Sequence, residues 1–153
     1  MILFVHMLVG ALLGAKIHSL AAIFLLGLIS HLVFDRFPHW EYSPDCLKKS
    51  AGKNCLKTWG EIALDLFVGF IIILWLSNSS PFLIYIIFGA FVALLPDGLT
   101  LIYWLWQPTI PALTRFCQWH KKLNILANKQ KKPIWGFIVE TTIIILSVWL
   151  FAL

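Results

Sequence analysis

Long apolar runs separated by short polar breaks dominate the chain. The breaks at residues 16 to 19 and 77 to 81 consist of turn residues, and Pro38 ends another run because proline cannot continue a helix. The apolar runs cover about residues 2 to 15, 19 to 37, 59 to 77, 81 to 98 and 133 to 153, and the fourth has room to extend to Trp106. A bilayer span needs about 20 apolar residues, or somewhat fewer in a short helix. The pattern therefore predicts five transmembrane helices.

The composition supports a membrane protein. Of 153 residues, 60% are hydrophobic and 12% charged, whereas a soluble domain is roughly half apolar and about a quarter charged. These values exclude a nucleic-acid-binding domain, a disordered tail and a secreted disulfide scaffold. We expect an all-α fold, with residues 1 to 153 forming a single integral membrane domain. A signal peptide over residues 1 to 22 is disfavoured because the basic start of such a peptide is missing.

The basic residues predict the topology. Eleven of the twelve lie close to two polar connections, 38 to 58 and 107 to 132. They are Arg36, Lys48, Lys49, Lys53 and Lys57, then Arg115, Lys121, Lys122, Lys129, Lys131 and Lys132. Lysine and arginine collect in cytoplasmic loops, so both connections should be cytoplasmic. Two spans separate them, and an even number of crossings does return the chain to the same side of the membrane. The N-terminus is then cytoplasmic and the C-terminus external.

Residues 107 to 132 have two faces at helical spacing, and the predicted helix covers about residues 110 to 128. One face is apolar and the other basic. The apolar side carries Leu113, Phe116, Cys117, Leu123 and Ala127, with His120 in its middle, and Arg115, Lys121, Lys122 and Lys129 lie towards the other side. We expect an amphipathic interfacial helix in the headgroup layer, with anionic phospholipid headgroups as its partners.

Ionisable residues inside a membrane are costly and usually mark a function. At a rise of 1.5 Å per residue, His6, Asp65 and Glu140 lie roughly 6, 9 and 10 Å from the start of their helices. Several others come near the ends of helices that run the opposite way, so all share the cytoplasmic half of the bilayer. Most lie on one helix face with a small residue four positions away. We therefore expect one interior cluster of His31, Asp35, Asp65, Asp97 and Glu140.

The same residues suggest metal chemistry. His31 and Asp35 lie four apart on one helix, which directs an imidazole and a carboxylate at one ion, and Glu61 and Asp65 repeat this spacing. Together with Asp97 and His120 they could bind zinc, manganese or iron. One free carboxylate, Glu61 or Glu140, would act as general base towards a metal-bound water. In the structural alternative, Asp65, Asp97 and Glu140 pair with lysines, Glu61 complements its helix dipole and His6 has no partner.

His39 and the cysteines leave further alternatives open. His39 follows Pro38 and is expected to face water, although it could also meet a phosphate. The three cysteines, Cys46, Cys55 and Cys117, fall on the reducing side, so free thiols are expected. A zinc knot that combines them with His120 is the less favoured alternative, because the spacing fits no standard pattern.

Three segments carry a resemblance to a known family. They are residues 9 to 14 after His6, residues 30 to 40 with the pattern S-H-x3-D-x2-P-H-W, and residues 94 to 97. These resemble small uncharacterised bacterial membrane proteins and, more distantly, the membrane-bound metal-dependent hydrolases. The resemblance implies a bacterial inner membrane location and makes His6, His31, Asp35 and Asp97 metal ligands. The family's His-Arg-Gly and Thr-His-Ser segments have no counterpart here beyond His18-Ser19.

The leading functional prediction is a metal-dependent hydrolase that acts on a phospholipid or lipid-linked substrate at the cytoplasmic membrane interface. The alternative is a non-catalytic small membrane protein whose polar cluster holds helices together or binds a partner. A proton or metal-ion carrier ranks last. Its path would have to cross the outer half of two spans, and residues 71 to 73 and 143 to 145 there are all isoleucine.

Overall fold

The structure, a computed structural model, describes residues 2–39, 53–106, 110–128 and 133–153. These residues form helices and no strand, so the predicted all-α class is confirmed for this part of the chain. The helices are α1 (Leu3–Lys16), α2 (Leu20–Phe34), α3 (Lys53–Leu76), α4 (Leu83–Trp106), α5 (Pro111–Asn128) and α6 (Pro133–Ala152).

Three of these helices are long and apolar enough to cross a membrane: α3, α4 and α6. The sequence predicts five spans, and the difference lies in the lengths of α1 and α2. They contain 14 and 15 residues and are therefore only about 21 to 23 Å long, against a hydrocarbon core of about 30 Å. Helix α2 already ends at Phe34, with Asp35 as its C-cap. Helix α4 does extend to Trp106 and contains Pro96 in its interior.

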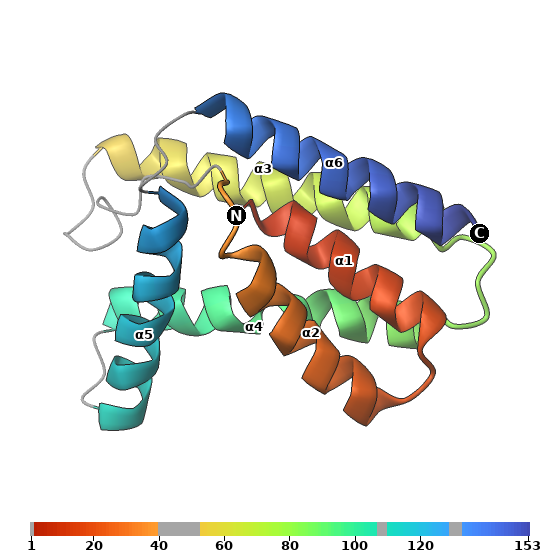
Figure 1. Ribbon diagram of the computed structural model, residues 1–153, viewed down its shortest axis with the longest axis horizontal. Coiled ribbons are helices and arrows are strands. Elements are labelled where there is room, and N and C mark those ends of the chain that lie inside the picture. Colours follow the sequence, from red (N-terminus) through yellow and green to blue (C-terminus); the bar gives the residue numbers. More distant parts are fainter. Residues whose placement is uncertain (1, 40–52, 107–109, 129–132) are drawn as a thin grey trace.

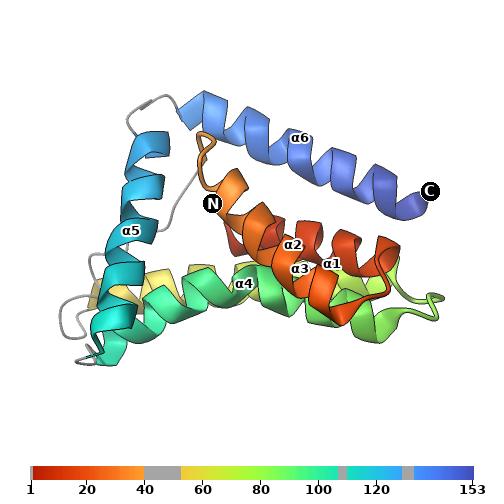
Figure 2. The same ribbon diagram turned by 60° about the horizontal axis from the view of Figure 1, so that its bottom comes forward.

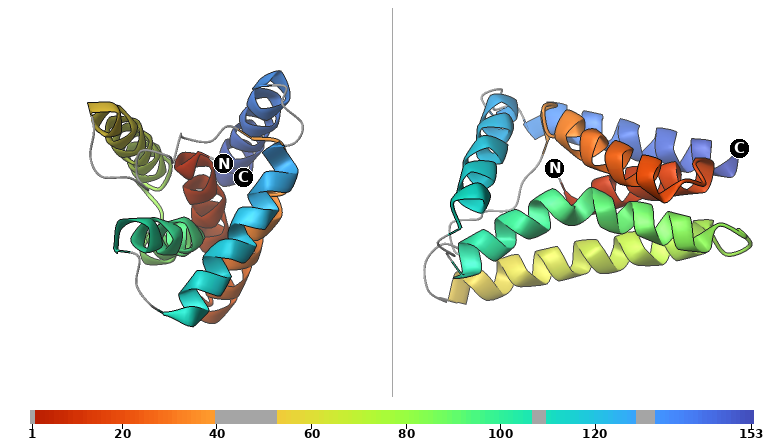
Figure 3. Two further views of the ribbon diagram at one scale, coloured as in Figure 1. Left: turned by 90° about the vertical axis from the view of Figure 1, so that its left-hand side faces the viewer. Right: turned by 90° about the horizontal axis from the view of Figure 1, so that it is seen from below.

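Helix α1 occupies the centre of the bundle, and α5 crosses one end of it (Figures 1 and 2). Helices α2, α3, α4 and α6 all pack against α1. The starts of α1, α3 and α6 and the ends of α2 and α4 lie at the end that α5 crosses, and the C-terminus lies at the opposite end (Figure 1). The side view in Figure 3 shows α5 standing across the other helices. The fold thus brings α5 and the ends of several other helices together at one end of the bundle.

Glycines allow α1 and α4 to touch backbone to backbone. A Cβ atom added at Gly10 would overlap the carbonyl oxygen of Gly89, and one added at Gly89 would overlap the carbonyl oxygen of Gly10. One turn further along α1, a Cβ at Gly14 would overlap the carbonyl oxygen of Tyr85. Small residues at this spacing are typical of closely packed membrane helices. This contact fixes the level of α1 relative to α4.

The outer surfaces of the long helices are apolar. Large side chains on α3 and α6, including Phe67, Trp75, Phe137 and Trp149, are exposed. In water, such exposure would cost roughly 25 cal/mol per Å² of apolar surface, whereas lipid would cover it without penalty. The chain is therefore consistent with a membrane protein in which α3, α4 and α6 are the candidate spans.

Helix α5 has the predicted division into two faces. Cys117, His120 and Leu123 are buried, while Arg115 and the Lys121-Lys122 pair are exposed. The buried face packs against α4, so its apolar residues meet protein. His120 is thereby directed into the bundle.

Candidate metal centre

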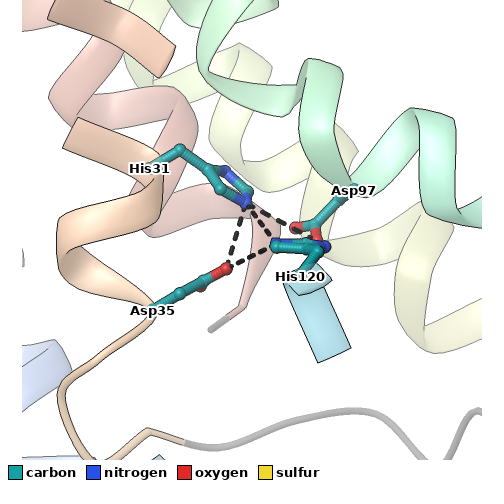
Figure 4. A group of neighbouring side chains, drawn as sticks. All are labelled: His31, Asp35, Asp97 and His120. Carbon is teal, nitrogen blue, oxygen red and sulfur yellow. Dashed lines mark hydrogen bonds and ion pairs between the residues drawn. The ribbon is translucent and has the colours of Figure 1, made fainter. Parts of the chain in front are cut away.

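Four side chains converge at the end of the bundle that α5 crosses (Figure 4). His31 and Asp35 come from the C-terminal end of α2, Asp97 from α4 and His120 from α5. One nitrogen or oxygen atom of each residue lies within 4.8 Å of the corresponding atoms of the other three. This cluster could hold a metal ion.

Helix α2 presents its two residues along a single buried stripe. Its buried residues are Ile23, Gly27 and His31, which lie four apart, and the buried Asp35 continues the stripe beyond the last turn. A Cβ at Gly27 would come within 2.9 Å of the Val92 side chain of α4, so this glycine allows α2 to approach α4. The i, i+4 spacing seen in the sequence therefore does direct both side chains to the interior.

The carboxylate of Asp35 is the centre of the cluster. Its Oδ2 atom lies 3.1 Å from Nε2 of His31 and 2.8 Å from Nε2 of His120. The two Nε2 atoms lie 3.2 Å apart, and Oδ1 of Asp97 lies 3.7 Å from Nε2 of His31. The side chains of His31, Asp35 and His120 are at most 2% exposed, whereas that of Asp97 is 25% exposed. Asp97 is thus the member of the cluster that can be reached from outside.

A backbone carbonyl of α4 fixes the orientation of His31. Nδ1 of His31 lies 2.6 Å from the carbonyl oxygen of Ala93, and because a carbonyl only accepts, the Nδ1–H donates. Ala93 lies in α4, three residues before Pro96. In the neutral ring the proton of His31 is therefore on Nδ1, and Nε2 carries the lone pair that a metal ion would bind.

A hydroxyl group fixes the orientation of His120 in the same way. The hydroxyl of Thr100 lies 2.9 Å from the carbonyl of Pro96 and 3.0 Å from Nδ1 of His120. When it donates to Pro96, it accepts from Nδ1–H of His120 and leaves Nε2 to bind a metal ion. The ring of Phe116, one turn earlier on α5, also stacks on His120. Outer partners of this kind are typical of metal-binding histidines, because they set the tautomer and the ring orientation.

These hydrogen bonds direct lone pairs towards one another. In their neutral forms with Nδ1 protonated, the rings of His31 and His120 present Nε2 lone pairs to each other and to the Asp35 carboxylate. Lone pairs at 2.8 to 3.2 Å repel unless a metal ion or a proton lies between them. Imidazole nitrogen and carboxylate oxygen are common ligands of divalent transition metals, so these residues fit a metal ion.

His6, which the resemblance makes a metal ligand, lies beside this group. Its Nε2 atom is 3.0 Å from Oδ1 of Asp35, whereas His31 and His120 contact Oδ2 of the same carboxylate. Its ring stacks on that of His31 with centroids 3.9 Å apart. The structure brings His6 to the cluster, where it contacts the other oxygen of Asp35.

Asp65 and Glu140 do not join the predicted cluster. Oδ2 of Asp65 accepts the N–H of Phe4 at 3.0 Å, and Oε1 of Glu140 accepts the N–H of Ile2 at 3.3 Å. The first N–H groups of a helix have no partner inside it, and these two acids supply partners at the start of α1. The four-residue cluster thus contains His31, Asp35 and Asp97 of the five residues predicted to converge. Asp65 and Glu140 bind the start of α1, because depth in the membrane does not specify which neighbour a side chain faces.

Glu61 also lies outside the four-residue cluster. It is exposed, and its Oε1 lies 3.8 Å from Nζ of Lys57, one turn earlier on α3. The helix-dipole role of the structural alternative is wrong, because α3 begins at Lys53 and its first turn contains no acidic residue. The role of general base that the sequence suggests for Glu61 or Glu140 has no counterpart in the geometry of the cluster.

The other histidine and the cysteines also differ from expectation. His39, expected to face water, is buried, and its Nδ1–H donates to the carbonyl of Phe37 at 2.7 Å. Cys55 and Cys117 are buried and form no disulfide, and burial raises the pKa of the Cys117 thiol, which disfavours the thiolate needed to bind zinc. Cys46 of the alternative zinc knot lies outside the described residues. His120, the histidine of that zinc knot, directs its Nε2 at Asp35.

Thr100 and the Ala93 carbonyl are the parts of the site that the sequence analysis missed. The nearest signal was Pro96, which disturbs the backbone hydrogen bonding of α4 in the turn that contains Ala93. Comparisons of the chain with models of protein families, with curated proteins and with solved structures found no match, so the resemblance to the membrane-bound metal-dependent hydrolases stays a prediction.

Proposed function

We propose that the protein is a metal-dependent hydrolase that acts on a phospholipid or lipid-linked substrate at the cytoplasmic face of the bacterial inner membrane. The observation that carries this proposal is the pair of inward-facing Nε2 atoms of His31 and His120 around the Asp35 carboxylate, with the Nδ1 atoms beside the Ala93 carbonyl and the Thr100 hydroxyl. The proposal includes α1 and α2 within the bilayer, which gives five crossings and a cytoplasmic N-terminus.

The nitrogen atoms of His31 and His120 and an oxygen of Asp35 would hold the ion. Their neutral imidazole and carboxylate groups suit zinc, manganese or iron. A bound divalent ion would supply Lewis-acid activation of water. The buried surroundings of these residues would exclude bulk water and strengthen the electrostatic interactions within the site.

Asp97 would serve at the open side of the site. Its Oδ1 lies further from His31 than the Asp35 oxygen does, and its side chain is the accessible one of the four. Such a carboxylate would accept the proton of an attacking water, as a general base must do within hydrogen-bond reach. This role passes to Asp97 because Glu61 and Glu140 have other partners.

The basic face of α5 supports an anionic substrate. Lys121 and Lys122 directly follow His120, and Arg115 lies on the same helix; all three side chains are exposed. Cations at the level of lipid headgroups attract anionic lipids, at about 1 kcal/mol for each residue near the surface. A lipid phosphate drawn to α5 would lie close to the opening beside Asp97.

A non-catalytic polar cluster is the second candidate. Protons in place of a metal ion could also separate the facing atoms of His120 and Asp35, and the cluster would then tie α5 to α2 and α4. The two functions differ in whether the protein carries a metal, which elemental analysis measures directly.

The test combines metal content with hydrolysis of vesicles. We expect protein purified without chelators to contain a divalent metal and to cleave lipids in vesicles rich in phosphatidylglycerol faster than in vesicles of phosphatidylcholine. His31→Ala and Asp35→Ala should lose metal and activity, and His39→Ala should lose less. His18→Ala is the matched control, because His18 is exposed at the opposite end of the bundle and stacks on Phe82. Metal-free wild type, or equal loss in all variants, would favour the structural function.

A further inference from the structure

His6 contacts the cluster but has no part in the proposed chemistry. It lies on α1, its side chain is 1% exposed, and it reaches the site across 29 residues of sequence. A buried imidazole needs partners for its polar atoms, so the atoms it contacts indicate what it does.

The two oxygens of Asp35 are divided between different partners. Oδ2 faces Nε2 of His31 and of His120, whereas Oδ1 faces Nε2 of His6 at 3.0 Å. An ionised carboxylate only accepts hydrogen bonds, so Nε2–H of His6 donates to Oδ1. With its proton on Nε2 and used in this way, His6 presents no nitrogen lone pair to the cluster from that side.

His6 also contacts the ring of His31. The two rings are stacked, with centroids 3.9 Å apart and planes 24° apart. His6 cannot easily move away, because Gly10, one turn further along α1, touches the backbone of α4. At the start of the same helix, Asp65 holds the N–H of Phe4. The rigid central helix thus holds His6 against both Asp35 and His31.

We propose that His6 is a positioning residue that limits Asp35 to a single metal-binding oxygen, Oδ2, and holds the plane of the His31 ring. The inference rests on the proposed metal site, and it removes His6 from the ligand set that the resemblance implies. Without His6, Oδ1 of Asp35 would lose this hydrogen bond, and the carboxylate could bind the ion through both oxygens. His6 would then control the coordination number without touching the metal.

The test uses three substitutions and cobalt(II) as the probe metal. The amide nitrogen of glutamine can take the place of Nε2, so His6→Gln keeps a donor to Oδ1. Asparagine is one bond too short to do so, and His6→Leu has no donor. Cobalt affinity is measured by competition with a chelator, and the visible spectrum of bound cobalt reports its coordination number.

We expect His6→Asn and His6→Leu to weaken cobalt binding about 10- to 100-fold, the usual effect of losing an outer partner, and to change the spectrum. His6→Gln should keep wild-type affinity and spectrum. The melting temperature of each metal-free variant identifies loss of folding, and the comparison between His6→Gln and His6→Asn holds even if His6→Leu does not fold.

Other outcomes separate this inference from the proposed function. If His6→Gln loses cobalt as fully as His31→Ala, His6 is a ligand and the positioning role is wrong, although the metal site stands. If all three variants match the wild type, His6 has no role at the site. If the wild type binds neither cobalt nor zinc, the proposed function fails and the positioning role fails with it.

Discussion

The Nε2 atoms of His31 and His120 lie 3.2 Å apart, although 89 residues separate them in the sequence. The first belongs to α2 and the second to α5, which packs mainly against α4. An ion between them would therefore connect α5 to α2 as well. This arrangement links metal binding to the attachment of α5.

Removing the metal should lower the thermal stability of the protein. An ion that binds only the folded state at 100 times its dissociation constant adds about 2.7 kcal/mol to the free energy of unfolding. We expect chelator treatment to lower the melting temperature of the wild type and added zinc to restore it. His31→Ala, which lacks a ligand, should melt at the same temperature with and without chelator. A chelator effect of equal size in both proteins would show that the stabilising ion binds elsewhere.

Thr100→Val should weaken metal binding while preserving the shape of α4. The substitution removes the hydroxyl that accepts Nδ1–H of His120, and loss of such an outer partner typically costs 10- to 100-fold in affinity. Thr100→Ser should retain most of the affinity. Thr142→Val is the matched control, because the Thr142 hydroxyl also bonds the carbonyl four residues earlier, on the exposed face of α6. Equal affinity in Thr100→Val and Thr142→Val would contradict the orienting role.

Periodicity predicted the parts of the site that depend on one helix at a time. His31 and Asp35 share a face because they lie four apart, and His120 lies on the apolar side of an amphipathic segment. Both relationships are present in the structure, where all three side chains are buried. The small-residue spacing likewise predicted a close seam, which occurs where Gly10 meets Gly89.

The partners that side chains meet on other helices could not be predicted from the depth of each residue in the membrane alone. Asp65 and Glu140 accept N–H groups at the start of α1, which need acceptors. Depth gives a position along the helix axis and leaves the direction around it undetermined. The role of Thr100 also depends on the position of α5, which no local pattern encodes.

Asp65→Leu should destabilise the protein without removing a metal ligand. The N–H of Phe4 would lose its acceptor, and an unsatisfied buried donor costs about 1 to 3 kcal/mol. Chemical denaturation in detergent would measure the difference, and metal content would check the cluster in the folded variant. Glu61→Leu is the control, because the exposed pair with Lys57 contributes at most about 1 kcal/mol. Complete loss of metal from folded Asp65→Leu would return Asp65 to the set of ligands.

The distribution of basic residues predicts a membrane topology in which α1 and α2 also cross the bilayer. With five crossings, the chain enters from the cytoplasm and ends outside, because basic residues collect in the two connections 38 to 58 and 107 to 132. With three crossings, by α3, α4 and α6 alone, the region around Ser50 and the C-terminus would still lie on opposite sides, but the short segment between α1 and α2 would not leave the cytoplasm. The decisive position is therefore His18, between these two helices.

A cysteine placed at His18 should react with a membrane-impermeant thiol reagent added to intact cells, because five crossings put this residue outside. Ser50→Cys should react only after the cells are opened, and reporter fusions at Ser50 and Leu153 should give opposite signals. All labelled proteins need Cys46, Cys55 and Cys117 replaced by serine first, so that the added thiol is the one detected. Protection of His18→Cys in intact cells would reduce the crossings to the three long helices, and matching signals at Ser50 and Leu153 would reject both topologies.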